Sequence, residues 1–203
     1  MSRQRCRGCG IHIHIGADGH TPKTLRNLVN IMAAREELLI NALKIDGGRI
    51  WTYCKTVNSG FLAAVNREKP KTMERLADIW YNENGAAYDR DSHYNQSRYH
   101  MLNLHATFTK GTIEFRLFQF NAPEPGHKNG IHAGRLKAYI QLCLALSQLA
   151  KTVKTARPAK PQTENQKYAM RTWLLRLGFI GDEFSAARRF LTERLDGNAA
   201  FRG

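Results

Sequence analysis

The sequence predicts an α+β protein in which an antiparallel sheet carries helices on one face. Three observations support this fold class. Residues 10–16, Gly-Ile-His-Ile-His-Ile-Gly, alternate strictly, which is typical of a β-strand. Residues 102–109 and 112–120 also alternate, and Lys110 and Gly111 between them suit a tight hairpin turn. Most of the remaining chain shows the spacing of amphipathic helices.

Composition and charge restrict the possible classes of protein. The chain has 203 residues, 42% of them hydrophobic and 4 of them cysteine, which allows a sizeable core and predicts reduced thiols. No apolar run approaches the roughly 20 residues that span a bilayer, so we expect a cytoplasmic protein without a membrane partner. The net charge of +14 favours anionic partners, but no recognition motif accompanies it. A basic nucleic-acid-binding accessory protein therefore remains only the alternative function.

The first strand predicts a platform for two imidazoles. Its isoleucines point to one face, and His12 and His14 point to the other, about 7 Å apart along the strand. Imidazole binds metal ions and can contact phosphate. A pair that merely faces solvent is an equally good interpretation of this segment alone.

Helices are expected before and after the second alternating region. Thr21 and Pro22 predict a helix start, and the apolar spacing continues to about Lys44. Further helices are expected over residues 60–67, 72–81, 131–151, 163–177 and 184–195. The polar residues 82–96 predict a surface loop over a site, and residues 121–130 predict a second loop.

A hairpin with its turn at Lys110 and Gly111 would gather polar groups on one face. In that register His105 lies opposite Arg116, Thr107 opposite Glu114, and Asn103 opposite Phe118. A solvated outer face is the plainer interpretation, because antiparallel sheets often keep one wet side. Both alternating regions place polar, reactive side chains on one face and large apolar side chains on the other, which favours a functional site.

A structural zinc site is another open interpretation of the first segment. Cys6 and Cys9 lie close to His12 and His14, and two thiolates with two imidazoles can hold zinc. On a regular strand the imidazoles would have to turn back toward the cysteines, so this alternative is less favoured.

Taken together, residues 10–16, Ser97–Asn103 and Gly111–Arg116 resemble the amidoligase family, relatives of carboxylate–amine ligases with the glutamine synthetase fold. The resemblance implies a curved sheet of that type. It also implies an ATP-dependent ligase that joins a carboxylate to an amine through an acyl phosphate. Small molecules or peptides would be the substrates, and ATP with Mg²⁺ or Mn²⁺ the cofactors.

The resemblance also implies roles for particular residues. His12 and Glu114 would be metal ligands, and His14 would lie beside the nucleotide phosphates. Arg116 and Arg98 would bind phosphate and act as catalytic residues. His105, which the expected hairpin pairs with Arg116, is a further candidate for binding the nucleotide.

The family's sheet normally begins with strands upstream of the two histidines. This chain has only a few residues there, so we expect an incomplete copy or a second chain that supplies the missing strands. Residues 1–151 would form the C-terminal part of the catalytic domain, 152–162 a linker, and 163–203 a helical extension.

Overall fold

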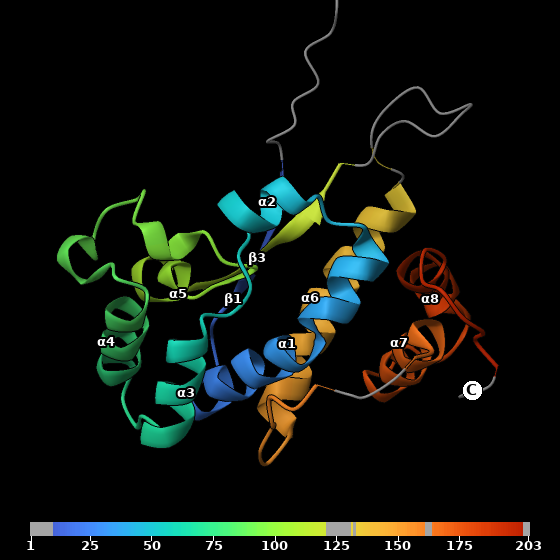
Figure 1. Ribbon diagram of the computed structural model, residues 1–203. Coiled ribbons are helices and arrows are strands. Elements are labelled where there is room, and N and C mark those ends of the chain that lie inside the picture. Colours follow the sequence, from blue (N-terminus) through green and yellow to red (C-terminus); the bar gives the residue numbers. More distant parts are fainter. Residues whose placement is uncertain (1–9, 121–130, 132, 161–163, 201–203) are drawn as a thin grey trace, which may run out of the picture.

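The computed structural model of the protein describes residues 10–120, 131, 133–160 and 164–200, and a small sheet lies at its centre (Figure 1). Strands β1 (Gly10–Gly16), β3 (Thr112–Gln119) and β2 (Leu102–Asn103) follow one another across the sheet in that order. Both pairings are antiparallel. The α+β class and the antiparallel sheet are therefore confirmed.

The helices flank the sheet on two sides in Figure 1, with α3, α4 and α5 on one side and α7 and α8 on the other. Their bounds are α1 (Pro22–Leu43), α2 (Gly47–Thr52), α3 (Ser59–Glu68), α4 (Met73–Glu83), α5 (His105–Lys110), α6 (Ala133–Thr152), α7 (Gln166–Arg176) and α8 (Ser185–Thr192). Short 3-10 turns cover Ala87–Asp89, Gln96–Arg98 and Asp182–Phe184. In the described part of the chain, no helix is long and apolar enough to cross a lipid bilayer.

Local sequence signals explain where the first long helix begins. The side chain of Thr21 accepts a hydrogen bond from the backbone N–H of Thr24, and Pro22 occupies the first turn, where its missing donor costs nothing. α1 ends at Leu43, as the sequence predicts. The short helix α2, which was not predicted, follows. The side chain of Asp46 caps its start by accepting a hydrogen bond from the N–H of Arg49.

The prediction of a hairpin between residues 102–109 and 112–120 is wrong. The chain leaves the sheet after Asn103 and forms α5 instead of a long second strand. The side-chain Oδ1 of Asn103 accepts a hydrogen bond from the N–H of His105, and Gly111 ends the helix at φ +66°, in the left-handed region. As a result, Asn103 lies opposite Glu114, and the predicted pairing of His105 with Arg116 does not form.

A β-bulge in β3 changes which side chains face the core. Between Ile13 and Ile11 β1 advances two residues, while β3 advances three, from Phe115 to Phe118. The extra residue shifts the alternation, so that Phe118 faces α6 and its ring stacks on Tyr139 at 4.4 Å between centroids. Glu114 and Arg116 stay on the opposite, polar face with the histidines of β1.

One hydrophobic core joins the C-terminal helices to the rest of the described chain. Met170 and Trp173 of α7 and Phe190 of α8 belong to the same buried cluster as Leu28 of α1 and Leu142 of α6. Asn27 of α1 connects this helix to the last turn of α6 and to the residue that follows α6, because its side chain donates to the carbonyls of residues 150 and 153. The division at residues 152–162 stays a prediction, and the predicted loop 121–130 lies outside the described residues.

Candidate active site

The carboxylate of Glu114 is the centre of the polar face. Three nitrogen atoms approach its Oε1: Nη1 of Arg116 at 2.8 Å, Nδ1 of His12 at 3.0 Å and Nε2 of His14 at 3.4 Å. Its other oxygen, Oε2, accepts a hydrogen bond from Nδ2 of Asn103 at 2.6 Å. The structure thus brings together four of the predicted site residues, and it adds Asn103 as a direct partner of the carboxylate.

The two long strands position these groups. His14 lies directly opposite Glu114 in the pairing of β1 with β3, and the bulge lies opposite His12. Nδ1 of His14 lies 2.9 Å from the hydroxyl of Thr112, which fixes the ring's orientation. Glu114 and Arg116 are buried, with 3% of each residue exposed, whereas the side chain of His14 is 40% exposed. The histidines therefore form the solvent side of the cluster.

The charge of Glu114 is strongly stabilised. Burial alone would raise the pKa of its carboxyl, but the hydrogen bonds from His12 and Asn103 and the charge of Arg116 outweigh that effect and lower the pKa to about 2. Glu114 is therefore ionised throughout the physiological range. Each of its oxygens already has hydrogen-bond donors around it.

Arg98 lies near this cluster but does not contact Glu114. Its guanidinium lies over the rings of Tyr94 and Tyr99, at 5.5 and 5.7 Å from their centroids. The guanidinium of Arg116 also lies over Tyr99, at 5.5 Å. Tyr99 therefore holds both arginines through cation–π contacts. The Nε atom of Arg98 is buried and has no hydrogen-bond partner among the described residues.

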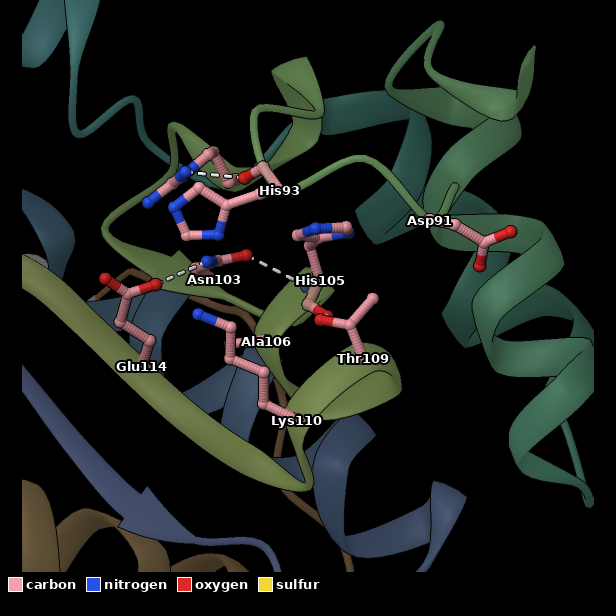
Figure 2. A pocket seen from close by; sticks show the side chains of 9 residues that line it. Asp91, His93, Asn103, His105, Ala106, Thr109, Lys110 and Glu114 are labelled. Carbon is pink, nitrogen blue, oxygen red and sulfur yellow. Dashed lines mark hydrogen bonds between the residues drawn. The ribbon is translucent and has the colours of Figure 1, made fainter. Parts of the chain in front are cut away.

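A pocket of about 190 Å³ opens beside Glu114 (Figure 2). Its charged and titratable lining groups come from the loop after α4, from α5 and from β3. They are Asp91, His93, Arg98, His105, Lys110 and Glu114, and Asn103, Ala106 and Thr109 complete the wall. The predicted loop 82–96 therefore does contribute to this pocket. Two permanent cations and two carboxylates around one small volume suit ligands that carry charge.

His105 lines the pocket, but its partner is not the one that the sequence analysis expected. Its Nδ1 lies 2.8 Å from the hydroxyl of Tyr81 on α4. Burial, followed by the charge of Arg98, lowers the pKa of His105, which favours a neutral imidazole. Tyr81 was missed because a contact between residues 24 positions apart leaves no signal in a periodic pattern. The role of His105 in nucleotide binding stays a prediction.

The described residues do not form a metal centre by themselves. No group of three or more histidine, cysteine, aspartate or glutamate side chains within the described ranges is arranged to hold a metal ion. His12, His14 and Glu114 are close together, and Nη1 of Arg116 contacts both Oε1 of Glu114 and Nδ1 of His12. The alternative zinc site with Cys6 and Cys9 lies outside the described residues.

The structure thus combines an α+β fold with a cluster of charged and titratable side chains on the polar face of its sheet. A comparison with protein families matches residues 2–147 to the family described as "putative amidoligase enzyme". The chain belongs to this family, which indicates a ligase at the level of the family. No curated protein and no solved structure matches the chain.

Proposed function

We propose that this protein is an ATP-dependent carboxylate–amine ligase that acts through an acyl phosphate on a glutamine synthetase-like sheet. One observation carries the proposal. Glu114, Arg116 and the two β1 histidines share a face of the sheet, next to a pocket whose lining includes the positive charges of Arg98 and Lys110. Family membership independently supports a ligase.

The proposed reaction has two steps. An oxygen of the substrate carboxylate attacks the γ-phosphorus of ATP, and ADP leaves. The amine nitrogen then attacks the acyl carbon, phosphate leaves with the C–O bond electrons, and the nitrogen loses a proton to form the amide. Phosphoryl transfer depends on positioning and charge neutralisation. The guanidinium groups of Arg116 and Arg98 would supply that neutralisation at the transferred phosphate.

The pocket beside Glu114 is the proposed place for the carboxylate and the amine. Lys110 and Arg98 can bind a carboxylate, whereas Asp91 can hold an ammonium group at the other side. A small molecule or the end of a peptide fits a volume of about 190 Å³. The neighbouring polar face then remains available for the triphosphate.

A divalent cation is proposed to enter as part of the nucleotide complex. His12 and Glu114 would contribute protein ligands, and phosphate oxygens would supply the others. Mg²⁺ prefers oxygen ligands, so a set that includes imidazole also suits Mn²⁺. The cation would neutralise charge on the triphosphate.

A second chain that extends the sheet remains part of the proposal. β1 forms one edge of the sheet among the described strands. Leu136, Ile140 and Leu144 form an exposed apolar row on α6, and Ser147 in the same row contacts His20, just after β1. An exposed strand edge beside apolar side chains is suited to strand addition.

Calorimetric titration with ATP tests the nucleotide part of this proposal. We expect the wild type to bind ATP only when Mg²⁺ or Mn²⁺ is present, and both His12→Ala and Glu114→Ala to weaken that binding at least tenfold. His20→Ala is the matched control, because His20 lies outside the site, and it should bind as the wild type does. Salt-dependent DNA binding that ignores these substitutions, without ATP binding, would favour the nucleic-acid alternative instead.

A further inference from the structure

We infer that Arg116 is an internal counter-ion that occupies the cation position at Glu114, so that a divalent cation binds there only together with an anion that draws the guanidinium away. This inference rests on the proposed function, because it concerns the same polar face. It adds a coupling between the binding of the cation and that of the anion, and it assigns Arg116 a role in the state without nucleotide.

The first support is that Arg116 donates a hydrogen bond to Oε1 of Glu114. Oε1 of Glu114 has nitrogen atoms of Arg116, His12 and His14 within 3.4 Å. A guanidinium nitrogen can only donate a hydrogen bond, so it satisfies the carboxylate in the way that a cation would. A metal ion needs the lone pairs of the carboxylate and of the imidazoles. Binding a metal therefore requires Arg116 to give up its contact with Oε1.

The second support is the position of the guanidinium. Nη1 of Arg116 lies 2.8 Å from Oε1 of Glu114 and 3.3 Å from Nδ1 of His12. The carboxylate oxygen and the imidazole nitrogen are themselves 3.0 Å apart, so Nη1 forms a triangle with them and covers one side of the pair that would share a metal ion.

The third support is the balance of charge. Arg98 and Arg116 lie over the same ring, that of Tyr99, at 5.7 and 5.5 Å from its centroid, so two positively charged groups already lie close together here. A divalent cation added alone would bring a second cationic group to the carboxylate that Arg116 already contacts. A phosphate or similar dianion beside Tyr99 would instead attract both guanidinium groups and free Oε1.

Cation and anion should therefore bind cooperatively. If an anion increases the affinity for the metal ion, the metal ion must increase the affinity for the anion by the same factor. The contact of Arg116 with Glu114 would thus prevent metal ions from binding in the absence of nucleotide.

Titration of Mn²⁺ followed by electron paramagnetic resonance tests the inference on the whole chain. Without other ligands, we expect Arg116→Gln to bind Mn²⁺ at least tenfold more tightly than the wild type. Arg75→Gln, which removes an exposed arginine paired with Glu68, is the matched control and should resemble the wild type. Arg116→Lys retains a positive charge and should also bind Mn²⁺ weakly.

Sulfate, a dianion that chelates Mn²⁺ only weakly, provides the second arm. It should tighten Mn²⁺ binding to the wild type, whereas sodium chloride of equal ionic strength should not, and Arg116→Gln should not respond. The inference is overturned if folded Arg116→Gln binds Mn²⁺ no better than the wild type. It is also overturned if sulfate has no effect on the wild type. If Arg116→Gln does not fold, the sulfate arm on the wild type decides the question. Calorimetry with ATP separately tests the proposed function.

Discussion

Arg116 and Glu114 lie two residues apart on β3, and Nη1 of the arginine is 2.8 Å from Oε1 of the glutamate. Both residues are buried, so their charges attract each other with little screening by water. Residues two positions apart on a strand share a face, which makes this contact a direct consequence of strand geometry. The histidines of β1 complete the cluster.

Acid should remove part of the stability that Glu114 contributes. Its pKa is about 2 in the folded protein and near 4.5 when unperturbed, so the contribution is complete above that ordinary value and is lost as the pH falls toward 2. Between pH 6 and pH 3.5 we expect a loss of roughly 1 kcal/mol from this group. Urea unfolding of the wild type and of Glu114→Gln isolates this contribution, because the substituted chain lacks it. A constant difference between the two chains across this range would contradict the account.

Glu36 should show the opposite dependence on pH. This buried carboxylate of α1 accepts a hydrogen bond from the N–H of Val57, but burial raises its pKa to about 7. The folded state therefore loses stability as the pH rises from about 4.5 to 7, by about 2–3 kcal/mol. Glu36→Gln can keep the hydrogen bond without the charge. By urea unfolding, we expect Glu36→Gln to be more stable than the wild type at pH 8 and nearly equal to it at pH 4. Equal stability at pH 8 would show that burying the charge of Glu36 does not destabilise the folded state.

Replacing Gly111 should destabilise the folded state because of its backbone conformation. Its φ is +66°, and a Cβ there would meet no atom within 4 Å, so Gly111→Ala introduces backbone strain without a clash. We expect a cost of about 1 kcal/mol in the free energy of unfolding. Gly47→Ala is the control, because a Cβ there is also unobstructed and φ lies outside the left-handed region. If both substitutions have the same effect, the role of Gly111 in ending α5 is not as described.

Asn103 should stabilise the folded state through two hydrogen bonds of its side chain. Its Nδ2 donates to Oε2 of Glu114, and its Oδ1 accepts from the N–H that begins α5. Asn103→Ala leaves a buried carboxylate oxygen and a buried N–H without these partners, at a cost of roughly 2–4 kcal/mol. Asn84→Ala, which removes one bond to the carbonyl of Trp80, should cost about 1 kcal/mol. Equal losses in thermal unfolding would contradict the double role of Asn103.

The sequence predicts those parts of the fold that depend on local signals. The alternation of residues 10–16 identifies β1, and Thr21 with Pro22 identifies the start of α1, because each pattern is satisfied within a few residues. Glu114 and Arg116 share a face in the predicted strand and in the structure, since alternation alone decides that relation. Four of the predicted site residues consequently lie together.

Contacts between distant segments explain what the sequence did not predict. Residues 102–109 alternate as a strand would, but Asn103 and Gly111 provide the start and end of a helix of only six residues, too short to show a helical period. Beyond the bulge in β3, Phe118 stacks on Tyr139, and His105 has the hydroxyl of Tyr81 as its hydrogen-bond partner. None of these partners can be identified from spacing along the chain.

The most direct test of the central claim is to observe the histidine rings while a paramagnetic nucleotide complex binds. In a chain labelled with ¹³C-histidine, substoichiometric Mn²⁺–ATP should broaden the ring signals of His12 and His14 beyond detection and leave that of His20 sharp. This result would place the triphosphate and its metal ion on the face that holds Glu114 and Arg116. Sharp signals from His12 and His14 at saturating Mn²⁺–ATP would contradict the account.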